Sequence, residues 1–358
     1  MQKRNFGLDV LRASAILFVL FNHVLNYFIT FHRSTIIGDI SGILGVEIFF
    51  VLSGFLIGKI LLTSFGEGSS HHAIKNFYIK RWFRTLPLYY FLLVIFIIIA
   101  AISTRKLDFY FLHFVFLQNF LPLKFFSISW SLAIEEWFYL LVPLLLFFSY
   151  KLQFFTKRTM TFLLLFIIAI ISIRVAYISF FHPTFDDIRK NTFLRFDSLF
   201  IGVLLAGVKM HLPVIYKHLN KIIFPIIALF LMAIMAYWYI IYYVQIELNP
   251  PFFVTAFSLP ILSILIATTI PFFEFSPFIN TRVHRLVVLR ETLIWVSLFS
   301  YSIYLTHVDI FDTVKGALPK LSPLIVMPIA LSLTFLTAYL LYWYIEKPFM
   351  KMRNKFIK

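Results

Sequence analysis

Residues 159–181 read TMTFLLLFIIAIISIRVAYISFF, and only one of these side chains, Arg174, carries a charge. A helix needs about 20 apolar residues to cross the hydrocarbon layer of a bilayer, so this stretch predicts a transmembrane helix. The rest of the chain has the same character, since 61% of its 358 residues are hydrophobic and only 13% are charged. Soluble domains carry about 25% charged residues, which excludes an ordinary cytosolic enzyme.

The same hydropathy pattern recurs along the chain, whose mean hydropathy is +0.90, and predicts about ten transmembrane helices. Residues 107–121 are also apolar but too short to cross, so we expect an interfacial or re-entrant segment there. The expected fold class is an all-α, multi-pass membrane protein with a single domain over residues 1–358 and no fused extracytoplasmic domain. The expected spans are residues 9–31, 38–63, 86–103, 132–150, 159–181, 194–210, 222–243, 252–272, 293–312 and 323–345.

The chain is strongly basic, with 32 lysine and arginine residues against 16 aspartate and glutamate residues. In a soluble protein this charge would suggest nucleic-acid binding, but in a multi-pass protein basic residues collect in cytoplasmic loops. The termini and even-numbered loops hold 20 of the basic residues, and the odd-numbered loops hold 8. We therefore expect both termini in the cytoplasm, the lipid bilayer as a partner and no nucleic acid.

The chain contains no cysteine. This excludes disulfides, thiolate zinc sites, a thiol nucleophile and an S-acyl intermediate. The adjacent histidines 71 and 72 lack metal-ligand spacing, and the sequence has no Walker loop, dinucleotide fingerprint or G-x-S-x-G motif. We expect no metal and no permanently bound cofactor.

Ionisable side chains within membrane spans are costly, so each is a candidate functional residue. Arg12 and His23 are 11 residues apart in the first span, which places them on one helix face with a rise of about 16 Å. His23 is the best general base in this span because imidazole titrates near neutral pH. The alternative is that Arg12 reaches the cytoplasmic surface and His23 hydrogen-bonds a neighbouring helix.

Glu135 and Glu136 open the fourth span, directly after a segment that contains Trp130 and Ser131. Adjacent helical residues point about 100° apart, so at most one of these carboxylates faces a given cavity squarely. Such a carboxylate could orient the imidazole of His23 and stabilise its charge. Acidic residues in a first helical turn also suit the helix dipole, which explains the pair without any function.

Further ionisable side chains lie in later spans. Arg174 in the fifth span requires a carboxylate or an anionic ligand as its partner. Arg195 and Asp197 open the sixth span and need not pair with each other. His307 follows Tyr304 near the outer end of the ninth span, and it is either a site residue or a structural histidine.

Arg81 and Arg84 precede the third span on the expected cytoplasmic side. If this segment is helical, residues three apart share a face, and their guanidinium groups form a fork suited to phosphate. The accumulation of basic residues in cytoplasmic loops explains the same pair without a ligand.

Six features follow one another along the chain: the Arg12 to His23 spacing, residues 45–57 (GVEIFFVLSGFLI), Arg81 with Arg84, residues 129–140 (SWSLAIEEWFYL), residues 195–202 (RFDSLFIG) and residues 301–307 (YSIYLTH). In this order, they resemble acyltransferase family 3, the integral-membrane O-acyltransferases of bacterial surface polysaccharides and related acceptors. The resemblance covers essentially the whole chain. One departure from the family pattern is Glu47, where many relatives have aspartate.

The resemblance implies a cytoplasmic acyl-CoA donor, often acetyl-CoA, and an acceptor hydroxyl on a glycan or lipid-linked sugar at the outer face. It implies that His23 is the catalytic base, that Glu135 belongs to the site, and that Arg12, Arg81 and Arg84 serve donor binding. The location that it implies is the bacterial cytoplasmic (inner) membrane.

The acyl-transfer hypothesis also requires hydrogen-bond donors for the oxyanion, and Ser131, Trp130 and Tyr304 are candidates.

A transporter or flippase of polysaccharide precursors is the main alternative, because intramembrane charges also build transport pathways. A polyprenol-type glycosyltransferase would require acidic residues in the first outer loop, residues 32–37, which has none. A non-catalytic helper of polysaccharide synthesis would tolerate the loss of His23.

Residues expected to contact substrate or to surround the site are Trp130, Ser131, Glu136, Arg174, Arg195, Asp197, Tyr304 and His307.

Overall fold

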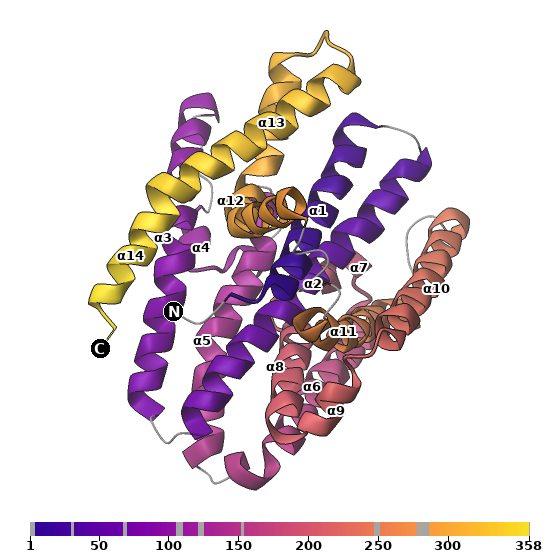
Figure 1. Cartoon of the computed structure of the whole chain (residues 1–358). Helices are drawn as coiled ribbons and strands as arrows, with labels where there is room; N and C mark the ends of the chain where they lie inside the picture. The colour runs from indigo at the N-terminus through magenta and orange to yellow at the C-terminus, as the bar shows by residue number, and fades with distance from the viewer. Residues whose placement is uncertain are drawn as a thin grey trace.

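The computed structural model describes residues 4–29, 32–66, 70–104, 110–120, 125–151, 154–246, 251–276, 279 and 286–357. Within these ranges the chain forms helices and no strand (Figure 1). The long helices are α1 (Phe6–Phe28), α2 (His32–Gly66), α3 (Ser70–Thr104), α5 (Trp130–Lys151), α6 (Phe154–Phe181), α8 (Phe196–His211), α10 (Ile223–Ile246), α11 (Phe252–Phe275), α12 (Val287–Ala317) and α13 (Pro323–Leu341). The short ones are α4 (Phe111–Phe114), η1 (Gln118–Phe120), η2 (Ser127–Ser129), α7 (Phe185–Lys190), α9 (Pro213–His218), η4 (Tyr342–Glu346), α14 (Lys347–Met352) and η5 (Arg353–Lys355).

Nine helical segments of the described chain are long and apolar enough to cross a membrane. They correspond to nine of the ten expected spans and confirm the all-α, multi-pass fold class. The remaining expected span is α8, whose 16 residues measure about 24 Å. Most of α8 is buried against other helices, and a helix enclosed by protein need not match the hydrocarbon thickness by itself.

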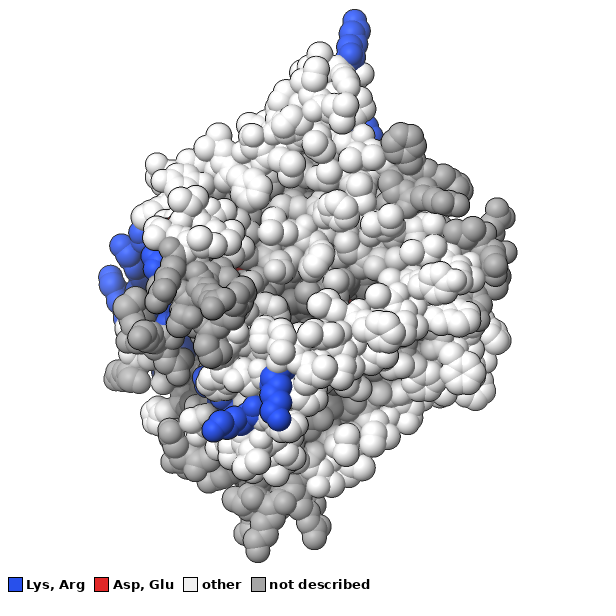
Figure 2. Space-filling view, turned by 45° about the vertical axis from the view of Figure 1, so that its right-hand side comes forward, with Lys and Arg blue, Asp and Glu red and all other residues white. Residues whose placement is uncertain are grey.

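The outside of the bundle is apolar, as expected for a protein solvated by lipid. Only 11% of the apolar stretch of α10 is buried within the protein, and Ile226, Leu229 and Phe230 are among its exposed side chains. Figure 2 shows one face on which uncharged residues dominate, with lysine and arginine side chains at its left edge, at its top and in its lower part. Such a surface would associate in water, so the surrounding solvent is hydrocarbon.

Helix α2 packs along both α1 and α8. The contact between α2 and α8 depends on two glycines. A Cβ at Gly54 would lie 1.9 Å from the carbonyl oxygen of Leu199, and one at Gly202 would lie 2.2 Å from that of Val51. These two glycines therefore allow α2 and α8 to pack closely.

The start of the third span differs from the expectation. Helix α3 begins at Ser70 rather than near residue 86, and its 35 residues measure about 52 Å. Hydropathy marks only the part of a helix that meets lipid, whereas the helix itself continues through the polar residues before it. Arg81 and Arg84 therefore lie on a helix and share a face, as the phosphate-fork hypothesis requires.

The apolar segment expected at residues 107–121 does not cross the membrane where the structure describes it. From residue 110 onward it forms only the short helices α4 and η1. The hydroxyl of Tyr89 donates to the carbonyl of His113 (2.8 Å), and the indole of Trp137 donates to that of Phe116 (3.0 Å). These contacts tie the segment to α3 and α5 and leave it short of a full span.

Candidate active site

A cavity lies among α1, α2, α3, α5 and α12, with about 820 Å³ of space between protein atoms, part of which is open to solvent. The structure thus brings together, from four helices, six of the residues that the sequence selected. They are Arg12, Arg81, Arg84, Ser131, Glu135 and Tyr304.

Three arginines make part of this cavity positively charged. Arg12 Nη1 lies 3.9 Å from Asp9 Oδ1, but Arg4 Nη2 also donates to that oxygen at 2.9 Å. In the described part of the chain, no carboxylate oxygen lies within 4.0 Å of the guanidinium groups of Arg81 and Arg84. Guanidinium groups that share a cavity without enough carboxylates to neutralise them favour an anionic ligand.

The two adjacent glutamates have different surroundings, as their helical geometry predicted. Glu135 lines the cavity and accepts a hydrogen bond of 2.6 Å from the hydroxyl of Tyr139, which lies 2.6 Å from Ser53 Oγ. Arg81 lies over the ring of Tyr139, 5.1 Å from its centroid. Glu136 does not line the cavity and is only 5% exposed. Only Glu135 is placed to meet a ligand.

Ser131 and Tyr304 form a polar pair in the cavity wall. Ser131 Oγ and the hydroxyl of Tyr304 lie 2.6 Å apart, and both residues line the cavity. Trp130 is 8% exposed and packs edge-to-face on Phe50, so its ring belongs to the wall behind the lining residues. Of the three candidate oxyanion donors, Ser131 and Tyr304 therefore have hydroxyl groups in the lining.

His23 and His307 lie against each other. Their ring centroids are 4.8 Å apart with an interplanar angle of 64°. The ring of His307 also lies 6.0 Å from that of Tyr304, which lines the cavity. His23 is not itself among the lining residues. Tyr304 lines the cavity and contacts His307, and His307 contacts His23.

Glu135 and His23 are not brought together, although the sequence suggested that this carboxylate could orient the imidazole. The carboxylate of Glu135 is engaged by Tyr139, and the ring contacts of His23 are with His307 and Tyr27. Helical periodicity placed each residue on a face of its own helix, but it could not determine which faces meet.

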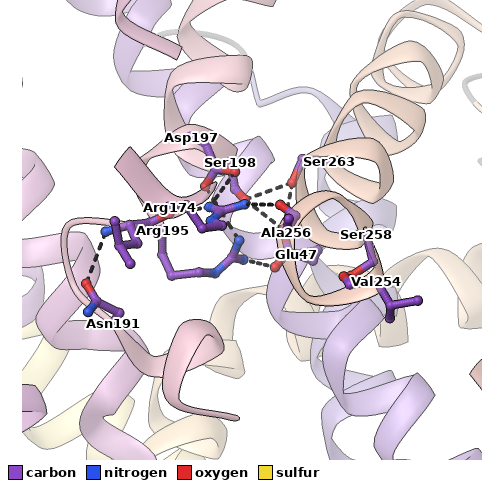
Figure 3. Close-up of polar contacts among 11 residues, drawn as sticks. Glu47, Arg174, Asn191, Arg195, Asp197, Ser198, Val254, Ala256, Ser258 and Ser263 are labelled. Atoms are coloured by element: carbon purple, nitrogen blue, oxygen red, sulfur yellow. Dashed lines mark hydrogen bonds and ion pairs between the residues drawn. The ribbon is translucent and has the colours of Figure 1, made fainter. Parts of the chain in front are cut away.

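A second polar cluster is fully buried among α2, α6, α8 and α11 (Figure 3). Arg174 Nη2 lies 2.7 Å from Asp197 Oδ2, so the expectation that Arg174 meets a carboxylate is confirmed. Arg195 Nη1 lies 3.5 Å from Asp197 Oδ1, which shows that these two residues do pair. Arg195 also forms an ion pair with Glu47, a residue that the sequence analysis left without a role.

This cluster balances two arginines against two carboxylates, and none of its four members lines the cavity. The sequence grouped Arg174, Arg195 and Asp197 with residues that contact or surround the substrate. The structure instead places them in a closed ion-pair network. Each buried charge in this network is paired with an opposite charge of the protein itself, not with a substrate.

Arg189 is a further residue near the site that the sequence analysis counted only as a loop charge. Its guanidinium carbon lies 4.9 Å from the ring centroid of Trp130, and its Nε donates to Asp186 Oδ1 at 3.0 Å. Burial raises the pKa of Asp186, but the basic side chains paired with it outweigh burial and hold the pKa below its ordinary value. Thr184 and Asp187 form the capping box that begins α7, and this pattern could have indicated the short helix from the sequence.

A cavity with an arginine cluster, enclosed by membrane helices and connected through Tyr304 to a histidine pair, is typical of a membrane enzyme or transporter of anionic compounds. The sequence profile of the family described as "Acyltransferase domain" matches residues 5–343. The chain therefore belongs to this acyltransferase family, which confirms the resemblance found in the sequence.

Individual relatives agree with this family. A protein of Staphylococcus aureus (strain COL), provisionally named an O-acetyltransferase, is 28% identical over 375 residues, which cover 96% of this chain and 57% of the relative. The O-acetyltransferase OatA of Staphylococcus aureus (strain NCTC 8325) is 28% identical over 369 residues, with the same coverage. The chain thus spans somewhat more than half the length of these curated relatives. No solved structure matches it.

Proposed function

We propose that the chain transfers an acyl group, most simply acetyl, from acyl-CoA to a hydroxyl group of a sugar or glycan. Its family and the names of its relatives support acyl transfer. The observation that carries the proposal is the arginine-lined cavity, because the phosphate groups of CoA are anions of the kind that guanidinium groups bind. The donor is a substrate, and no resident cofactor is required.

The donor would enter from the side where α1 begins. Arg81 and Arg84 hold the CoA phosphates, and the pantetheine arm extends past Arg12 toward Ser131 and Tyr304. Arg12 and His23 are separated by about 16 Å along α1. The thioester therefore reaches the neighbourhood of His23 while the charged nucleotide stays near the arginines, so only the acyl group needs to cross.

The reaction transfers one proton twice. The acceptor O–H bond breaks as its proton moves to His23, and the oxygen forms a bond to the thioester carbonyl carbon. Tyr304 and Ser131 donate hydrogen bonds to the resulting oxyanion. The C–S bond then breaks, and the CoA thiolate takes the proton from the imidazolium. An acyl-imidazole at His23 would give the same products in two steps.

The other polar residues have supporting roles in this proposal. Glu135 offsets part of the positive charge of the cavity and holds Tyr139 in place. Trp130 and Glu136 shape the wall behind the lining residues. The network of Arg174, Arg195 and Asp197 joins α6 to α8, and the ion pair of Arg195 with Glu47 keeps α8 against α2.

We further propose that both termini lie in the cytoplasm of a bacterial cell, in its cytoplasmic membrane, and that the acceptor binds from outside. The distribution of basic residues supports this orientation. A hydroxyl of a surface glycan or a lipid-linked sugar would then approach His23 from the outer face.

His23→Ala tests this function in the membrane-embedded protein, with acetyl-CoA as donor and membrane glycans as acceptor. The readouts are release of free CoA and the mass of the glycan by mass spectrometry. We expect a loss of transfer of about 10²–10⁴-fold, since that is the usual contribution of a positioned base. His218→Ala, at an exposed histidine of α9, is the matched control.

Normal acetylation by the His23→Ala variant would contradict the assignment of the base. Movement of an unmodified glycan precursor without CoA release, in the unaltered protein, would contradict acyl transfer and support a transporter.

A further inference from the structure

The imidazole of His307 is held by its own helix in one orientation and one tautomer. Its Nδ1 lies 3.0 Å from the carbonyl oxygen of Ile303 and 2.9 Å from that of Tyr304. Carbonyl oxygens only accept hydrogen bonds, so Nδ1 carries the hydrogen and donates it. In the neutral ring, Nε2 is then an acceptor with a free lone pair.

That lone pair is buried without a donor. His307 is 0% exposed, and among the described residues Nε2 has no hydrogen-bond partner. A buried acceptor without a donor is unfavourable, and such groups in native structures call for an explanation, of which a catalytic role is one. The neighbouring ring that could supply the donor is His23, whose centroid is 4.8 Å away.

The imidazole of His23, in contrast, is not fixed by a hydrogen bond to the described residues. His23 is partly exposed, and its imidazole makes ring contacts. The two rings meet edge to face, so a rotation of His23 about its side-chain torsions would direct the N–H group of its neutral ring at His307 Nε2. Of the two histidines, the partly exposed His23 is the one that can reach an acceptor hydroxyl.

We infer that His307 is a positioning residue for His23: its Nε2 accepts a hydrogen bond from one ring nitrogen of His23 and leaves the other nitrogen unprotonated for the acceptor hydroxyl. This inference rests on the proposed function. It assigns to His307 the orienting role that the sequence suggested for Glu135, whose carboxylate is engaged by Tyr139 in the cavity.

The same contact assists the proton transfer. When the acceptor hydroxyl gives its proton to the free nitrogen of His23, both nitrogens of that ring carry hydrogen. The hydrogen bond to His307 Nε2 then has a charged donor and becomes stronger, which stabilises the imidazolium. His307 itself neither gains nor loses a proton, and the CoA thiolate takes the proton from His23 at the end of the cycle.

Two amide substitutions separate positioning from a structural role. In His307→Asn the amide reaches about as far as Nδ1, so it can keep the hydrogen bonds to the backbone carbonyls but places no acceptor at the position of Nε2. In His307→Gln the amide oxygen reaches the position of Nε2 and can accept from His23. The measurement is kcat and KM for acetyl-CoA, with the unaltered protein assayed in parallel and the folded fraction of each variant quantified by size-exclusion chromatography in detergent.

We expect kcat of the glutamine variant, per folded molecule, to exceed that of the asparagine variant at least tenfold, with KM for acetyl-CoA unchanged in both. Equal kcat in the two variants, at whatever level, or a higher kcat for asparagine overturns the inference and leaves His307 a structural residue. If the unaltered protein itself releases no CoA, the proposed function fails rather than the role of His307.

Discussion

Arg195, the N-cap residue of α8, and Glu47 of α2 form an ion pair inside the bundle, where their side chains are 0% and 2% exposed. Ser198 Oγ and Ser263 Oγ donate to the other oxygen of this carboxylate at 2.9 and 2.7 Å. Neither charge has access to water, so each depends on the other and on these hydroxyl groups. The pair fastens two helices together, and one of them, α2, also lines the cavity.

Removing one member of this pair should destabilise the fold more than removing one of its hydrogen bonds. Glu47→Ala leaves Arg195 buried with one fewer carboxylate, and losses of about 3–5 kcal/mol are usual for such a change. Ser263→Ala should cost only about 1 kcal/mol. Thermal unfolding of both variants in detergent micelles measures the difference, and equal midpoints would show that the ion pair is not required for stability.

The two cavity arginines of α3 should determine donor affinity. Arg81→Gln and Arg84→Gln each remove a charged contact to phosphate, typically worth about 1.5–3 kcal/mol, so we expect KM for acetyl-CoA to rise about tenfold or more. Lys80→Gln is the matched control, because it removes the same charge from an exposed position on the same helix. Steady-state kinetics on reconstituted protein gives the comparison. An equal rise in KM for Lys80→Gln would attribute the effect to overall charge.

The hydroxyl of Tyr304 should matter for the chemical step. Tyr304→Phe removes a candidate donor to the oxyanion, and losses of about 10²–10³-fold in kcat are typical of such donors. Tyr301→Phe is the control on the same helix, since Tyr301 also lines the cavity but its hydroxyl donates to the carbonyl of Thr85 at 2.8 Å. Similar kcat values for the two variants would remove Tyr304 from the mechanism.

The proposed orientation can be measured because the chain has no cysteine, so any introduced cysteine is unique. Lys320→Cys lies between α12 and α13 on the expected outer side, and Lys217→Cys lies in α9 on the expected cytoplasmic side; both positions are exposed. A membrane-impermeant maleimide added to intact cells should label the first and not the second. The reverse pattern would invert the topology and place His23 near the cytoplasm.

Fold class could be predicted from sequence because the thickness of the bilayer sets the length of an apolar helix, whatever its neighbours are. Residues 159–181 therefore indicated a transmembrane helix without any tertiary information. The start of α3 could not be found in this way, because no change in hydropathy marks the point where a polar helix begins. The six residues that line the cavity were selected from the sequence because each is polar in an apolar span or, as at Arg81 and Arg84, beside one.

The sequence by itself determined that this protein is an all-α membrane protein, that it resembles a family of acyltransferases, and which polar side chains are exceptional in such an environment. Only the tertiary structure decided how those side chains are paired. It joined Glu47 to Arg195, placed Glu135 on Tyr139, and set His23 beside His307. The physical reason is that the helical period fixes the face of its own helix on which a residue lies, whereas the partner of that face depends on how all the helices pack together.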